Sequence, residues 1–108
     1  MKTIEIDNIR CLVGGNASEN WQILENAKSE HLFFHLSSFS SCYVIGEIDS
    51  VPNLEAIKKM AECCKSNTKY KNIPKVKVDY TLCGNVYKGE NVGEVYYKSN
   101  KKVNKIVV

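Results

Sequence analysis

Two histidines and five cysteines are the residues of this chain with the most obvious capacity for chemistry. His31 and His35 have the H-x3-H spacing of some zinc sites, and the adjacent Cys63 and Cys64 could be imagined as further ligands. On a strand, however, residues four apart are separated by about 13 Å, which is too far for one metal with bonds of about 2 Å. Adjacent cysteines on a helix also point in different directions. We therefore expect no metal and no cofactor, and we interpret His35 as a buried or hydrogen-bonded side chain.

A nucleophilic pair of Cys42 and His35 is a second chemical possibility, because facing strands of a hairpin can bring two side chains together. The nearby sequence offers no third group to orient such a pair and no identifiable oxyanion donor. Cys42 is better explained as a small apolar residue. An odd number of cysteines without C-x-x-C spacing is typical of reduced thiols rather than of a secreted disulfide framework. We expect no enzymatic activity.

The Gly14-Gly15-Asn16 turn precedes a predicted helix and could present backbone amides to a phosphate. Asn16 is a typical N-cap residue, and Glu19 follows it at the spacing of a capping box. Because such turns are frequent at helix starts, the motif alone does not establish an anion site. It is still a better candidate for a ligand site than the histidines.

Lysines dominate the second half of the chain. Three basic and eight acidic residues precede Lys58, whereas twelve lysines and four acidic residues occur from Lys58 onward. Residues 65–78 contain five lysines and residues 98–105 contain four, and neither stretch contains a carboxylate. Such a distribution attracts polyanions. Tyrosines interleaved with the lysines could stack on bases. The alternatives are an ordinary solvated surface and a docking face for an acidic protein.

The elements that position these residues form one predicted domain, 1–108, because the sequence contains no repeat, linker or low-complexity tract. Alternation along 75–82 predicts a half-buried strand with its lysines, Asp79 and Thr81 in solvent. We expect an α+β fold in which two helices pack on one face of a mainly antiparallel sheet. The predicted elements are strands at 3–6 and 9–13, a helix after Asn16, a central hairpin of 32–36 and 42–45, a helix at 53–66, and strands at 75–82, 93–98 and 103–108.

The N-terminal sequence has acidic residues where a signal peptide has an apolar run. No segment approaches the length of an apolar transmembrane helix. We therefore expect a location in the cytoplasm or nucleus, with the cytoplasm as our prediction, and no membrane partner.

Six segments follow one another in an order that is known from a protein family: GGNASENWQI, LFFHL, SSCYVI, an amphipathic helix, KVDYTLCGNVYKGENVGEVYY and KIVV. In this order they resemble the NFACT RNA-binding domain, and the resemblance spans nearly the whole chain. The family's Gly-x-Asn-Ala-x-x-Asn stretch is matched at 14–20, its aromatic strand at 33–35 and its small-residue turn at 40–44. Further family positions correspond to Lys65, 78–81, Lys88 and Gly93.

The resemblance implies RNA binding in a translation or ribosome-quality-control context, without enzymatic activity. Domains of this family occur within large ribosome-quality-control factors and as standalone domains in short coiled-coil-domain relatives. Two positions depart from the family: Phe33 stands in place of a tryptophan, and Tyr43 in place of a histidine. Because tyrosine does not titrate near neutrality, a role that requires an imidazole at position 43 is not carried over.

We therefore predict a nucleic-acid-binding domain whose partner is tRNA, rRNA or the ribosome, with DNA as another polyanion of the same chemistry. The alternative is a protein-interaction module whose basic face docks on an acidic partner. Backbone donors are expected near Gly14 and Asn16, and a polar pocket at His35 and Tyr43. The full set of predicted nucleic-acid-binding residues is Lys65, Lys69, Lys71, Lys75, Lys77, Lys88, Gly14, Asn16, Asn20, His35 and Tyr43.

Overall fold

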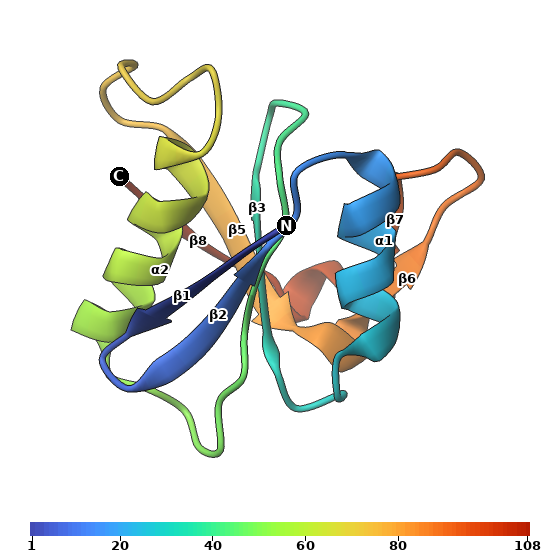
Figure 1. Ribbon diagram of the computed structural model, residues 1–108, viewed down its shortest axis with the longest axis horizontal. Coiled ribbons are helices and arrows are strands. Elements are labelled where there is room, and N and C mark those ends of the chain that lie inside the picture. The colour runs from blue at the N-terminus through green and yellow to red at the C-terminus, as the bar shows by residue number, and fades with distance from the viewer.

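A six-stranded antiparallel sheet organises the computed structural model, which describes all 108 residues (Figure 1). Its strands, in spatial order, are β1 (Lys2–Ile6), β2 (Ile9–Val13), β4 (Val44–Gly46), β3 (Leu32–Leu36), β5 (Lys77–Leu82) and β8 (Asn104–Val107). The two helices are α1 (Ala17–Asn26) and α2 (Leu54–Ser66), and β6 (Val86–Lys88) pairs with β7 (Val95–Tyr97) in a separate ribbon. The predicted α+β class, the antiparallel sheet and the single compact domain are confirmed.

The first hairpin illustrates how local sequence determines local structure. Asp7 and Asn8 link β1 to β2, and both have positive φ angles, of 50° and 66°. Two left-handed residues in succession form a turn whose twist matches that of the flanking strands, and Asp and Asn tolerate this conformation. Ile6 therefore pairs directly with Ile9, as expected for a two-residue connection.

The two helices cover opposite faces of the sheet, so the prediction that both pack on one face is wrong. Neighbouring residues of β3 show the arrangement: Phe34 is buried in the core beneath α2, and Phe33 is buried with Ile23 of α1. Successive side chains of a strand point to opposite faces, and a strand buried on both faces has a continuous apolar sequence. Leu32–Leu36 is such a strand, and Figure 1 shows it between the two helices.

The prediction for β5 is correct for its lysines, because Lys75 and Lys77 are exposed, but the rest of that face is buried. Asp79 and Thr81 were expected in solvent, but their exposed fractions are only 6% and 3%. The β6–β7 ribbon lies over this face and is held to α1, since Trp21 Nε1 donates a hydrogen bond to the carbonyl oxygen of Glu94 at 3.0 Å. Of the polar side chains on that face of β5, Lys77 alone is exposed.

Neither helix combines the length and the apolar character that crossing a membrane requires.

Candidate functional site

A surface cleft of about 1130 Å³ lies at one end of the sheet, where four loops meet. Figure 1 shows these loops gathered at the same end of the domain, at the top of the view. His35, Asp79 and Tyr97 contribute to the lining from β3, β5 and β7. The four loops contribute residues from the turn before α1 (14–17), the β3–β4 loop (37–42), the loop after α2 (67–69) and the β6–β7 loop (91–95).

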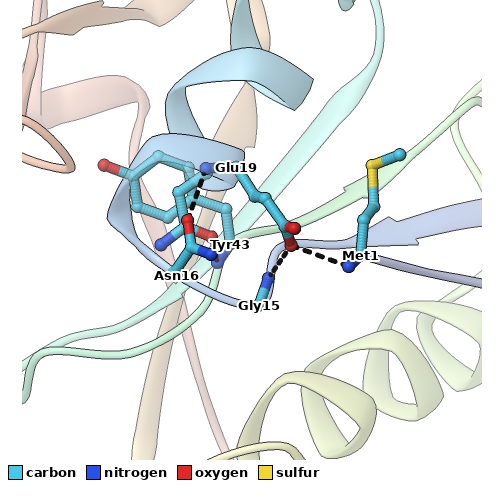
Figure 2. Close-up of polar contacts among 6 residues, drawn as sticks. Met1, Gly15, Asn16, Glu19 and Tyr43 are labelled. Carbon is cyan, nitrogen blue, oxygen red and sulfur yellow. Dashed lines mark hydrogen bonds and ion pairs between the residues drawn. The ribbon is translucent and has the colours of Figure 1, made fainter.

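The backbone amides of the turn before α1 donate hydrogen bonds to groups of the same domain. Asn16 caps the helix, since the backbone N–H of Glu19 donates to Asn16 Oδ1 at 2.9 Å. Glu19 Oε1 accepts a hydrogen bond from the Gly15 amide at 2.8 Å and forms an ion pair with the ammonium group of Met1 at 2.7 Å (Figure 2). The hydrogen bond with that ammonium, and then the one from Gly15, holds the pKa of Glu19 below its ordinary value. The Gly14 amide donates to the Tyr43 carbonyl oxygen, so neither glycine amide is available to a phosphate in this conformation.

Asn20 is a structural link between α1 and the start of β4. It is buried, its Oδ1 accepts a hydrogen bond from the Tyr43 backbone N–H at 3.1 Å, and its Nδ2 lies 3.5 Å from the carbonyl oxygen of Ser41. Gly14 makes room for this amide: a Cβ at position 14 would lie 1.9 Å from Asn20 Oδ1. Gly14 and Asn20, both predicted as RNA-binding residues, therefore shape the wall of the cleft.

His35 and Tyr43 lie side by side, with ring centroids 5.4 Å apart and ring planes at 80°. The Tyr43 side chain is fully buried, its hydroxyl donates a hydrogen bond to the Gly93 carbonyl oxygen, and burial raises its pKa to about 12. Gly93 has a φ of +88°, which favours glycine at this point of the β6–β7 loop. Of the predicted pair, His35 is the residue that lines the cleft.

His35 is expected to make stability depend on pH. Burial lowers the pKa of His35 from its ordinary value of 6.5, and the neighbouring Asp79 opposes this effect. The unfolded chain then binds the proton more readily, so the contribution is complete above about pH 6.5 and is lost as the pH falls toward the folded-state pKa. We expect the unfolding free energy of wild type to decrease relative to that of His35→Gln between about pH 7.5 and pH 5.5. Urea denaturation of both proteins across that range tests this, and parallel curves would contradict it.

Asp79 is the main residue of the cleft that sequence reasoning missed. Its Oδ1 accepts hydrogen bonds from Ser37 Oγ and Lys105 Nζ, both at 2.6 Å, and its Oδ2 accepts one from the Tyr97 hydroxyl at 3.1 Å. Burial, with the nearby Asp79 carboxylate, raises the pKa of Tyr97. The signal in the sequence was an isolated acid in the lysine-rich strand 75–82. The alternation pattern assigned that acid to solvent because it carries no information on what covers the second face.

The structure does not form the Cys42–His35 pair. Cys42 packs against the core beneath α2, where its Sγ and that of Cys64 each lie 3.5 Å from the carbonyl oxygen of the other residue. His35 belongs to the opposite face of the sheet. His31 Nδ1 accepts a hydrogen bond from the Lys28 backbone N–H at 3.3 Å. No three His, Cys, Asp or Glu side chains come together as a set that could hold a metal ion.

Cys42 is expected to be the most reactive of the five thiols. A hydrogen bond with the Cys64 thiol lowers the pKa of Cys42, whereas burial raises the pKa of Cys11 and of Cys83 to about 12. The thiolate is the reactive form, and Cys42 is only half-buried. Iodoacetamide should therefore label Cys42 first, with Cys63 next, as followed by peptide mass spectrometry. Equal labelling rates at Cys42 and Cys11 in the folded protein would contradict this order.

Five of the predicted lysines lie along one border of the domain, which we call the lysine edge: Lys65, Lys69, Lys71, Lys75 and Lys77. The Val108 main-chain oxygen accepts hydrogen bonds from Lys65 Nζ at 3.0 Å and from the Val76 backbone N–H at 2.8 Å. The end of α2 therefore meets the start of β5. None of the five lysines forms a salt bridge with an Asp or Glu.

Lys69 connects the lysine edge to the cleft, which it lines. Lys88 belongs to a different region. It lies in β6, forms an ion pair with Glu25 and is placed 5.0 Å from the centroid of the Trp21 ring. Five of the six predicted lysines thus come from one stretch of chain, at the end of α2, in the following loop and at the start of β5, with Lys77 on the face of β5 that points away from α2. The sixth, Lys88, lies apart from them in β6.

Fold and site together define a small α+β domain with a polar cleft at the loop end of an antiparallel sheet and an unpaired lysine edge beside it. Neither a protein-family model nor a curated protein matches the sequence. The C-terminal part of the fibronectin/fibrinogen-binding protein from Streptococcus suis has a similar structure, with a TM-score of 0.89 and 22% sequence identity over 99% of this chain. The match covers 44% of that solved chain. At this level of identity the similarity establishes the shared fold.

Proposed function

We propose that this domain binds RNA through the lysine edge and the adjoining cleft. The observation that carries the proposal is that five lysines come from the end of α2, the following loop and the start of β5, and that none of them has an Asp or Glu partner. Lysines in this state can neutralise phosphates and release the counterions condensed on a nucleic acid. Lys88 is left out of the proposed surface because it is paired with Glu25.

The cleft offers groups suited to the sugar–phosphate backbone. The hydroxyls of Ser38 and Ser40 line it from the β3–β4 loop and have no hydrogen-bond partner within the domain. Ser37, Asn67 and Thr68 also line it, but their side chains already bond to Asp79, Cys63 and Lys65. Serine hydroxyls commonly bind phosphate and ribose oxygens and so position an RNA without reading its sequence. The His35 ring also lines the cleft. The assignment to tRNA or rRNA, and to cytoplasmic translation or ribosome quality control, is supported by the resemblance to the NFACT RNA-binding domain.

A second candidate function is protein interaction, in which the lysine edge docks on an acidic partner. It is favoured by the fold that this domain shares with the C-terminal part of the fibronectin/fibrinogen-binding protein from Streptococcus suis. Both candidates use the same lysines, so the chemistry of the partner distinguishes them. A basic surface steers an acidic protein as it steers a nucleic acid.

Salt dependence of tRNA binding, with heparin as competitor, tests the RNA proposal. Each neutralised phosphate contributes about 0.7 to 0.9 to the slope of log affinity against log salt, so five lysines predict a slope of roughly −3.5 to −4.5. We expect tRNA to stay bound when heparin of equal charge is added. Affinity that is unchanged from low to moderate salt would overturn the proposal. Complete displacement by heparin, together with tight binding of an acidic protein, would favour the second candidate.

A further inference from the structure

We propose that Phe39 and Tyr70 form a stacking platform for one unpaired RNA base at the rim of the cleft. This inference rests on the proposed RNA binding and adds the position and the chemical class of a base subsite. It requires a flat aromatic surface that is open to solvent, a cation beside it, and an adjoining cleft for the backbone.

The two rings come from different loops and form a nearly parallel stack. Phe39 lies in the β3–β4 loop and Tyr70 in the loop after α2, and their ring centroids are 4.1 Å apart with an angle of 23° between the planes. The exposed fraction of Phe39 is 37%, although large apolar side chains generally contribute to the core. Phe39 also lines the cleft. The stack therefore presents an aromatic surface at the entrance of the site.

The cations needed beside a stacked nucleotide come from the lysine edge. Lys69 Nζ lies 5.5 Å from the centroid of the Tyr70 ring, and Lys69 lines the same cleft as Phe39. Lys71 follows Tyr70 in the chain, is exposed and forms no salt bridge. A base on Phe39 would thus have its flanking phosphates within reach of lysines. Because every base has a π-face, a platform of this kind tolerates many sequences and selects for unpaired bases.

A second exposed aromatic pair lacks these features and provides a control. Tyr87 and Tyr96 on the β6–β7 ribbon have exposed fractions of 47% and 46%. Their rings are tilted at 42° and their centroids are 5.6 Å apart. The neighbouring lysine, Lys88, is occupied by Glu25. An exposed aromatic ring is therefore common to both places, whereas a nearly parallel stack beside lysines without an Asp or Glu partner is found at Phe39 and Tyr70.

The experiment compares a single-stranded oligoribonucleotide with an abasic oligonucleotide of the same length, which carries the same phosphates without bases. Wild type is expected to bind the base-bearing form roughly 10-fold more tightly, as a single stacked base provides. Phe39→Leu keeps an apolar side chain without the ring and should lose this difference. Phe39→Tyr should keep it, and so should the control variant Tyr96→Leu. Thermal unfolding of each variant shows that the fold is intact.

The outcomes separate the platform from the RNA proposal itself. Equal, salt-dependent binding of both oligonucleotides by wild type would overturn the platform and leave the RNA proposal standing. If Phe39→Leu weakens binding of both oligonucleotides by the same factor, the aromatic stack only tethers two loops, and the platform is again overturned. If wild type binds neither oligonucleotide nor tRNA in a salt-dependent manner, the RNA proposal fails and the platform fails with it.

Discussion

The triple variant Lys71→Glu, Lys75→Glu, Lys77→Glu is expected to bind tRNA on the order of 100-fold more weakly than wild type at about 0.1 M salt. Three phosphate contacts are lost, so the slope of log affinity against log salt should become shallower by roughly two to three units. The new carboxylates also repel the RNA backbone. All three lysines are exposed and form no salt bridge, so the free energy of unfolding should change by less than about 0.5 kcal/mol for each substitution.

A matched variant with the same change in charge controls for net charge. Lys98, Lys101 and Lys102 are also exposed and form no salt bridge, but they lie near the other end of the β5–β8 pair, where the Lys102 carbonyl oxygen accepts a hydrogen bond from Thr81. Replacing these three by glutamate should weaken tRNA binding by less than about 10-fold. Fluorescence anisotropy with labelled tRNA measures both variants. Equal losses would show that affinity follows net charge and would contradict a role for the lysine edge.

Gly14→Ala is expected to lower the free energy of unfolding by about 3 kcal/mol, through overpacking and the loss of a buried hydrogen bond. A Cβ at position 14 would lie 1.9 Å from Asn20 Oδ1 and 3.1 Å from Asn20 Cα. The 3.1 Å contact with Cα is tight but needs only a small shift, whereas the 1.9 Å contact requires the Asn20 amide to leave its position. Displacing that side chain leaves the Tyr43 backbone N–H without its partner inside the protein. A decrease of this size corresponds to a melting temperature lower by roughly 10–20 °C.

Gly15→Ala is the control for this substitution, because its Cβ would make its one close contact with the end of the flexible, partly exposed Glu19 side chain. The nearest atom, Glu19 Oε1, would be 2.8 Å away and can move aside, so we expect a loss of less than about 1 kcal/mol. The double variant Gly14→Ala, Asn20→Ala should be little less stable than Asn20→Ala alone, since the clash is then absent. Urea and thermal denaturation measure all four proteins. A Gly14→Ala protein as stable as wild type would refute the explanation.

Local patterns in the sequence were sufficient to predict most elements. The two-residue turn at Asp7 and Asn8 and the cap at Asn16 depend on a few neighbouring residues, and both predictions are confirmed. The hairpin of β3 and β4 was also predicted, with an early start for the second strand. These features follow from turn and capping chemistry, which acts over a short stretch of chain.

The arrangement of layers was not predictable in the same way, because it depends on contacts between distant segments. Phe33 and Phe34 are both apolar, and the sequence does not state which helix covers each of them. The burial of Asp79 likewise depends on Tyr97 and Lys105, which come from later strands. From the sequence alone, an acid that follows two lysines is expected in solvent. In the fold, the β6–β7 ribbon covers Asp79.

The candidate site also combines features that are local in the sequence with features that depend on distant segments. The lysines between 65 and 77 were identified from composition, and their gathering follows from closeness in the sequence. The cleft itself required four loops to meet, and the stack of Phe39 on Tyr70 joins two of them. The backbone amides before α1 were predicted as donors for a phosphate, but Glu19 and Tyr43 occupy two of them.

Burial of β3 on both faces has a consequence for how this domain can vary. Inserting or deleting one residue within Leu32–Leu36 would exchange the side chains of the two cores, because every later residue of the strand would turn to the opposite face. The loops around the cleft have no such restriction, since surface connections accept changes of length far more readily. Length variation should therefore accumulate in these loops, so that ligand preference can diverge while the central strands retain their spacing.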